Sequence, residues 1–285
     1  METPRRKPQG LCIEAFHDPK VPGVTCHVSQ AKTGGVSGTL GLAQDPSQFS
    51  LACRQTGAIV INTNAGIRTP KDLEGKRVGV NRGYTVTTGV WARSVLQDEY
   101  GVDLGKITWV LSGDEHVAEY RPPPNVVPME KGRKMSEMLV NGELAAAIGV
   151  EVDHPDVKPL IPNALDAGLN ALGSRGHYPI NHLMVIKDEV LVAHPALAAD
   201  VFNAFAESKR VYLQRLKAGQ IAKPTAINAM HLRVMDITGD PLPYGIAPNR
   251  HVIEELIGHT LKQGIITRPV TVNELFAGAT RALVA

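Results

Sequence analysis

The stretch RVGVNRGYTVTTGVWARSVLQDEYGVDL, residues 77–104, decides the fold. It begins with a short apolar segment, Arg77–Val80, which predicts a strand. A polar loop containing Gly83 follows, and apolar residues then recur near helical spacing, at Val86, Val90, Trp91, Val95 and Leu96. Gly101 is expected to end this helix. A strand that leads through a glycine-containing loop into a helix is one step of a βαβ unit.

The alternation of strands and helices continues on both sides of this stretch. Further strands are predicted at residues 58–62, 107–111, 143–150 and 182–187. Thr69 and Pro70 open a helical turn as N-cap and first helical residue, and longer helices are predicted at residues 134–140, 197–216 and 249–263. Asn249 is the expected cap of the last helix, and the proline-rich residues 121–128 are expected to form a loop. This pattern predicts an α/β fold with a largely parallel sheet.

The N-terminal segment, residues 11–57, is of a different kind. It holds all three cysteines, Cys12, Cys26 and Cys53, and short β-rich segments broken by Gly-Gly and Asp-Pro turns. The cysteine spacing matches no compact zinc site, and a disulfide is expected only in an oxidising compartment. Residues 32–38 lack the GxxxxGK[ST] order of a phosphate-binding loop. We therefore expect a small β-rich segment in front of the α/β part, with no metal and no cofactor.

Composition excludes several classes of protein. The 285 residues carry a net charge of +2, with 43% hydrophobic and 20% charged residues, as in an ordinary soluble globular protein. This charge predicts no nucleic-acid partner. No apolar run is long enough for a membrane span, and METPRRKPQG has no apolar segment behind it that would make it a secretory signal. The expectation is a cytoplasmic chain; whether it forms a homo-oligomer is left open.

The chemistry is predicted first at residues 81–88, NRGYTVTT, where a strand leads into a helix. Backbone N–H groups near a helix N-terminus favour a carboxylate or a phosphate. Candidate ligand-binding residues are the whole polar set, with Arg82 as cation and Gly83 allowing close approach: Asn81, Arg82, Gly83, Tyr84, Thr85, Thr87 and Thr88. The alternative is simple helix capping by threonine beside an exposed arginine.

Two further polar segments follow predicted strands or precede them. In Ser112–Arg121, SGDEHVAEYR, the residues Glu115, His116, Glu119 and Arg121 offer acid–base groups or a carboxylate clamp. The alternative is a solvated loop with a local ion pair. In GHYPINH, residues 176–182, Tyr178 and His182 are candidates, although a structural role is the default for a histidine there. The cluster at residues 153–156, DHPD, is too small to predict a metal site.

Two family resemblances can be stated on longer strings. VTCHVSQAKTGG, GTLGLAQDPS and ACRQTG, within residues 11–57, resemble the middle of the CreA family of small bacterial proteins. The strings AGIRTPKDLEGKRVGVNRGYTVTTGVWARSVLQDEYGVDL, TWVLSGDEHVAEYR, GELAAAIGV, HYPINHLMVIKDE and DPLPYGIAPNR, within residues 65–285, resemble the 4,5-dihydroxyphthalate decarboxylase family. That family is similar to the type II periplasmic-binding-protein fold of transporter solute receptors.

The second resemblance implies a two-lobed fold with the ligand between the lobes. Residues 58–80 and 183–285 would form the first lobe and residues 81–182 the second, behind a CreA-like partial segment at residues 1–57. Members of the family begin with a strand-helix-strand unit that builds one wall of the cleft. Residues 1–57 are expected not to match that unit, which leaves the first lobe incomplete.

By resemblance, the function is decarboxylation of a hydroxylated aromatic dicarboxylate such as 4,5-dihydroxyphthalate. For such a reaction our hypothesis is that His116 or His182 acts as base or acid and that Glu119 orients the histidine. The helix N-terminus Thr85–Thr88, with Arg82, would hold the carboxylate that stays. The implied partner is a small aromatic or carboxylate molecule. Two alternatives stand beside this one: a non-catalytic solute-binding protein and an inactive fusion product.

Overall fold

The computed structural model describes residues 10–17, 24–32, 49–55 and 59–285 without residues 114, 116 and 118, with side chains described from residue 59 onward. Contacts divide the chain into two compact units. We call Gln55–Ile180 with Ala222–Ala285 the sheet unit, and Met1–Arg54 with Asn181–Ile221 the small unit. The lobe boundaries expected from the sequence stay a prediction.

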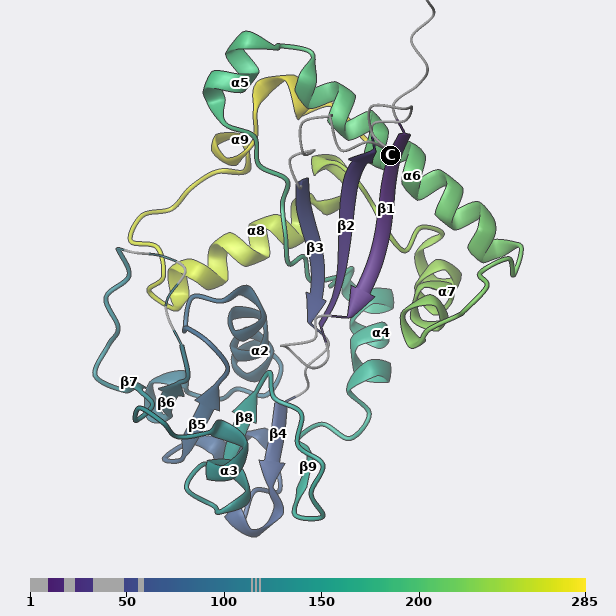
Figure 1. The fold of residues 1–285 in the computed structure, drawn as a ribbon. Helices are drawn as coiled ribbons and strands as arrows, with labels where there is room; N and C mark the ends of the chain where they lie inside the picture. The colour runs from purple at the N-terminus through teal and green to yellow at the C-terminus, as the bar shows by residue number, and fades with distance from the viewer. Residues whose placement is uncertain are drawn as a thin grey trace, which may run out of the picture. The chain divides into compact units, whose positions relative to one another are not determined.

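The sheet unit is built on six strands (Figure 1), which are β4 (Ile59–Asn62), β5 (Arg77–Val80), β6 (Thr108–Leu111), β7 (Val126–Pro128), β8 (Ala146–Ile148) and β9 (Val157–Pro159). Their order across the sheet is β7-β6-β5-β8-β4-β9. The pairs β5–β6, β6–β7 and β5–β8 are parallel, whereas β4 pairs antiparallel with β8 and β9. The predicted α/β class with a parallel-rich sheet is therefore confirmed.

Alternation along the strands gives the sheet two buried faces. On β6, Trp109 belongs to one apolar cluster and Val110 to another, and on β8 Ala146 and Ala147 divide in the same way. Helix α2 (Thr87–Asp98) contributes Val90 and Leu96 to the first cluster; α3 (Met135–Val140) contributes its apolar residues to the second. The result is a helix on each face, as expected for a sheet with parallel strands.

Helix α3 packs closely on β5 because Gly79 has no side chain. A Cβ atom at this position would lie 2.8 Å from Met135 Sδ and 2.9 Å from Leu144 Cδ1. Such separations are shorter than carbon contacts in proteins. The glycine in the centre of the RVGV strand is thus explained by the approach of α3 to the sheet.

The remaining elements of the sheet unit flank these layers. They are η1 (Thr63–Ala65), η2 (Pro70–Leu73), η3 (Leu104–Lys106), α4 (Ala164–Arg175), α7 (Ala226–Thr238), α8 (Ile246–Lys262), α9 (Val272–Leu275) and η4 (Gly278–Thr280). Helices α4 and α7 meet at Leu169, Leu172 and Val234, and α8 packs on α2. As predicted, η2 begins after Thr69 with Pro70 in its first turn, and Asp72 accepts a hydrogen bond from the Thr69 amide at 2.8 Å.

The described residues of the small unit form a three-stranded sheet and two helices. Its strands β1 (Gly10–His17), β2 (Val24–Lys32) and β3 (Phe49–Gln55) carry one cysteine each and lie in the order β1-β2-β3, with β1 and β2 antiparallel. The predicted β-rich N-terminal segment is confirmed at the level of the backbone. Helices α5 (Asp188–Ala193) and α6 (Leu197–Lys217) complete this unit. Among the described residues, no helix is long and apolar enough to cross a membrane.

Several local predictions are wrong. Residues 182–187 form no strand, and Leu183, Met184 and Val185 are exposed there. Residues 126–128 are not a loop but strand β7, and the strand predicted at 143–150 is only Ala146–Ile148. Asn249 does not cap α8, because the helix begins earlier, at Ile246; its Nδ2 donates instead to the carbonyls of Pro243 and Gly245 at 2.8 Å.

Asn62 offers a test of how β4 holds α3. The side chain is 2% exposed, and its Nδ2 donates to the carbonyl oxygens of Leu139 at 2.8 Å and Val140 at 3.1 Å. Asn62→Ala would leave these carbonyls of the last turn of α3 without that donor, so we expect a loss of about 1–3 kcal/mol in the free energy of unfolding. Urea denaturation measures it, with the exposed Asn64→Ala as control. Equal stability of the two variants would contradict this account.

Candidate functional site

The first candidate site lies where β5 and β6 end. Asn81 follows β5, and its Nδ2 donates to the carbonyl of Gly149, just after β8, at 2.9 Å. Ser112 follows β6, and its hydroxyl donates to Asn81 Oδ1 at 3.3 Å and accepts from the Arg82 amide at 2.8 Å. Short polar side chains therefore tie the carboxyl ends of three neighbouring strands together, at the edge where α/β sheets place their ligands.

The loop between β5 and α2 has an unusual backbone at Arg82. Its φ is 70°, the only positive φ of a non-glycine residue among those described. Such a conformation costs free energy and persists only where neighbours enforce it. Gly113 is one such neighbour, since a Cβ atom there would lie 3.2 Å from Arg82 Cα. The segment after β6 thus lies directly on this loop, with Arg82 exposed beside it.

Glu115 fills the predicted anion position. Its two carboxylate oxygens accept hydrogen bonds from the amides of Tyr84 and Thr85, both at 2.8 Å, and from the Thr85 hydroxyl at 2.7 Å. These donors lie just before α2, whose N-cap residue Val86 offers no capping side chain. Donors for a ligand carboxylate were expected from the sequence at residues 81–88, and the binding of a ligand there stays a prediction. In this structure these donors hold a carboxylate of the same chain.

A buried cation lies behind these donors. Arg93 on α2 is 0% exposed; its Nη2 donates to the Tyr84 carbonyl at 2.5 Å and its Nε to Gln263 Oε1 at 2.8 Å. Gly89 makes room for it, because a Cβ atom there would lie 2.9 Å from Arg93 Nη1. Burial lowers the pKa of Arg93 to about 10, so the guanidinium is still charged at neutral pH. Sequence reasoning missed Arg93. Its position one helical turn after Gly89 was the available signal, but this spacing does not reveal that Arg93 is buried.

Aromatic rings enclose the guanidinium on the sheet side. Arg93 Cζ lies 3.6 Å from the centroid of the Tyr84 ring, a cation–π arrangement. The Tyr84 ring stacks on Tyr120, with centroids 5.7 Å apart and planes 3° apart, and meets Trp109 edge-on at 6.2 Å. The Tyr120 hydroxyl is buried with no hydrogen-bond partner among the described residues. Burial raises the pKa of Tyr120, so this hydroxyl stays protonated.

For the other predicted ligand-binding residues, the structure gives positions but no hydrogen bond to Glu115 among the described contacts. Thr87 and Thr88 open α2 and are half-buried. Arg121 is exposed, and its Nη1 donates to the Tyr120 carbonyl at 3.1 Å. Tyr178 donates its hydroxyl to the Pro241 carbonyl at 3.0 Å and packs against the α4–α7 cluster. Their roles in binding stay predictions.

The three predicted catalytic residues do not form a described cluster. His116 lies outside the described residues, Glu119 is exposed on the segment after β6, and His182 is exposed in the small unit. The structure brings residues 81–85 together with Ser112 and Glu115. The catalytic roles of His116, His182 and Glu119 likewise stay predictions.

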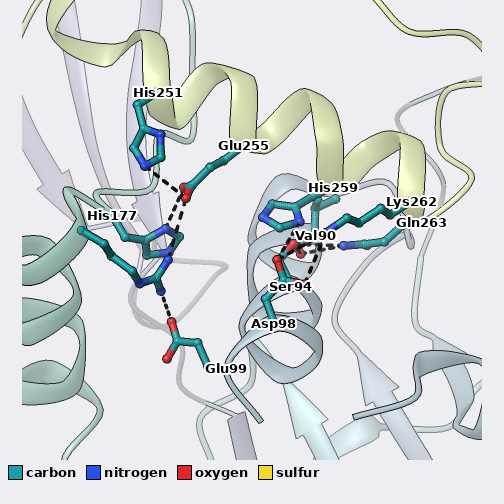
Figure 2. Close-up of polar contacts among 11 residues, drawn as sticks. Val90, Ser94, Asp98, Glu99, His177, His251, Glu255, His259, Lys262 and Gln263 are labelled. Atoms are coloured by element: carbon teal, nitrogen blue, oxygen red, sulfur yellow. Dashed lines mark hydrogen bonds and ion pairs between the residues drawn. The ribbon is translucent and has the colours of Figure 1, made fainter. Parts of the chain in front are cut away.

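A second polar cluster, not predicted, lies between α2 and α8 (Figure 2). Its centre is Glu255, which accepts from His177 Nδ1 at 2.9 Å and also contacts His251 at 3.3 Å and Arg175 at 3.8 Å. Arg175 in turn pairs with Glu99 at the end of α2. On α8 the residues His251, Glu255 and His259 are four positions apart, so they share one helix face. That spacing was the available sequence signal.

Trp91 separates two buried histidines of this cluster. Its ring meets His177 edge-on at 5.4 Å and His259 at 5.6 Å, and its Nε1 donates to the Ile180 carbonyl at 2.7 Å. His259 is 7% exposed and lies 3.9 Å from Asp98. Burial lowers the pKa of His259, against the smaller, opposite effect of Asp98. At neutral pH this imidazole is therefore uncharged. Among the described residues, no group of histidine, cysteine and acidic side chains forms a metal site.

Comparison with known proteins confirms both resemblances. Residues 6–78 match the family model of the CreA protein. The 4,5-dihydroxyphthalate decarboxylase of Comamonas testosteroni is 29% identical over 289 aligned positions, which cover 94% of this chain and 86% of that protein. Protein CreA of Escherichia coli (strain K12) is 52% identical over 52 residues, 18% of this chain and 33% of that protein. The chain thus spans about a third of the length of this CreA protein.

The two matches share part of the chain. Because 94% of the chain aligns with the Comamonas decarboxylase, that match extends beyond residues 65–285 into the segment that also matches CreA. The expectation that residues 1–57 lie outside the decarboxylase resemblance is corrected accordingly. Among solved structures, the periplasmic aliphatic sulphonate binding protein SsuA of Escherichia coli is 12% identical, with a TM-score of 0.38 over 76% of this chain and 67% of that chain.

The buried His259 predicts a pH dependence of stability. Its pKa is lowered from 6.5 in the folded protein, so as the pH falls below 6.5 the unfolded state takes up the proton first, and stability is lost. His259→Gln removes this titration. Urea denaturation from about pH 8 to about pH 5 is expected to show a smaller loss in His259→Gln than in the unchanged protein. His251→Gln, whose side chain is 61% exposed, serves as control. Parallel pH curves for all three proteins would refute the prediction.

Proposed function

We propose that this chain is a decarboxylase of a hydroxylated aromatic dicarboxylate of the 4,5-dihydroxyphthalate type. The observation that supports it most is the carboxylate of Glu115 held by Tyr84 and Thr85 in front of the buried Arg93. Such a group of donors suits the ligand carboxylate that stays on the ring. The 29% identity to the Comamonas enzyme over most of both chains supports the same substrate class.

The reaction requires one base and one acid but no oxidant. A base removes the proton of the ring hydroxyl para to the departing carboxylate, and the electron pair moves into the ring. An acid protonates the ring carbon that bears the departing carboxylate; the bond from that carbon to the carboxylate then breaks, CO₂ leaves, and the electron pair of the broken bond restores the aromatic ring. In this proposal His116 or His182 acts as base or acid and Glu119 orients the histidine. The helix N-terminus Thr85–Thr88, with Arg82, holds the second carboxylate.

A non-catalytic carboxylate-binding protein is the second candidate. It is supported by the three donors that hold the Glu115 carboxylate, namely the Tyr84 amide, the Thr85 amide and the Thr85 hydroxyl. A protein that only binds would need no more than this. An inactive chain is the third candidate and would neither bind nor turn over the ligand.

The experiment incubates the full chain with 4,5-dihydroxyphthalate and measures CO₂ and 3,4-dihydroxybenzoate. We expect turnover in the unchanged protein and a decrease of about 10²-fold or more in kcat for His116→Gln or His182→Gln, since each would lose an acid–base group. His251→Gln, which lies outside the proposed site, is the control.

Each other outcome assigns a different function. Thermal stabilisation by the ligand without CO₂ would show a binding protein. Neither stabilisation nor product would show an inactive chain. Turnover near that of the unchanged protein in both histidine variants would exclude the catalytic assignment while leaving the reaction in place.

A further inference from the structure

We propose that Glu115 is a resident carboxylate that competes with the ligand for one site, and that Arg93 is the positioning residue that makes this site attract carboxylates. An external carboxylate would then bind by taking over the hydrogen bonds of Glu115. The inference rests on the proposed function only for the identity of the natural ligand. The exchange itself concerns any carboxylate that fits.

The charge of Arg93 reaches the site through a single peptide group. Arg93 Nη2 donates to the carbonyl oxygen of Tyr84, and the N–H of the same peptide group, which belongs to Thr85, donates to Glu115 Oε2 at 2.8 Å. Hydrogen bonds in such a chain polarise one another, most of all when the first donor is charged. The Thr85 amide is therefore a stronger donor to a carboxylate than an ordinary backbone amide.

Arg93 needs an anion that the described residues do not supply directly. Its guanidinium is fully buried, its two described hydrogen bonds go to uncharged oxygens, and Nη1 has no partner among the described residues. A buried charge without compensation is costly. Tyr84, Tyr120 and, after them, Glu115 act electrostatically on Arg93, and Glu115 is the carboxylate among the three. Because neither described hydrogen bond of Arg93 goes to Glu115, the arginine can keep its position when another carboxylate replaces Glu115.

The donors make exchange more favourable than simple departure of Glu115. Tyr84 is 4% and Thr85 8% exposed, so water reaches their amides poorly once the carboxylate leaves. An unpaired buried N–H costs free energy, which a second carboxylate would avoid by forming the same bonds. Glu115 itself is half-buried on the segment between β6 and β7. Its presence lowers the apparent affinity for ligand by the fraction of molecules in which it is bound.

The test removes the resident carboxylate and supplies acetate instead. Glu115→Ala is expected to lower the melting temperature, and acetate to restore it in a saturable way that chloride at equal ionic strength does not reproduce. Glu274→Ala is the matched control. Glu274 accepts from the Thr271 amide at 2.6 Å and its hydroxyl at 2.7 Å on an exposed turn, with no buried arginine behind it. Acetate should rescue neither Glu274→Ala nor the unchanged protein. An equal effect of acetate on all three, or none on Glu115→Ala, would overturn the inference.

The role of Arg93 is tested in the same background. In Glu115→Ala with Arg93→Lys, the charge remains but the fork that donates to Tyr84 is lost. The acetate concentration for half-maximal rescue is expected to rise roughly tenfold. A residue that only supports the fold would lower the melting temperature and leave that concentration unchanged, which would refute the positioning role. If the double variant does not fold, Gln263→Ala, which removes one partner of Arg93, takes its place with the same expected direction.

Binding of 4,5-dihydroxyphthalate separates this inference from the proposed function. Glu115→Gln is expected to bind it at least tenfold more tightly than the unchanged protein, as measured by calorimetry. Rescue by acetate without any binding of dihydroxyphthalate would refute the proposed substrate and support the resident carboxylate. Turnover of dihydroxyphthalate without acetate rescue would do the reverse.

Discussion

The candidate site depends on one interaction, the hydrogen bond from the buried Arg93 guanidinium to the Tyr84 carbonyl. A full charge in an apolar interior is tolerated only where its surroundings compensate it. Here the guanidinium faces the ring of Tyr84 and the side-chain oxygen of Gln263, Gly89 leaves room for it, and the Glu115 carboxylate acts on it electrostatically. Because Gln263 follows α8 directly, one cation joins the loop before α2, the helix itself and the end of α8.

A second set of hydrogen bonds brings distant parts of the chain together at one edge of the sheet. Asn81 and Ser112 fix the ends of β5 and β6, and Asn81 reaches Gly149 beyond β8. With that frame in place, the segment after β6 lies on the β5–α2 loop and brings Glu115 to the amides of Tyr84 and Thr85. The apolar clusters on both faces of the sheet hold these strand ends in place.

Sequence reasoning succeeded where the signal is local. The apolar spacing of α2 and the Thr-Pro start of η2 depend on neighbours within one or two turns, and both were predicted. Residues 182–187 are also apolar, and a strand was predicted there. A strand needs a neighbouring strand to pair with, and the apolar pattern of a segment does not show whether such a neighbour exists. Val185 is 85% exposed. The donors of Tyr84 and Thr85 could be predicted for the same local reason. Their occupation by Glu115, 30 residues away, and the burial of Arg93 against Gln263, 170 residues away, could not.

The position of Trp91 gives the molecule an optical reporter of its own protonation. The chain has two tryptophans, and Trp109 lies in the apolar core, edge-on to Tyr84. Trp91 lies between His177 and His259, and a protonated imidazole quenches indole emission strongly. The fluorescence of Trp91 in the unlabelled protein therefore reports the protonation of the buried His259.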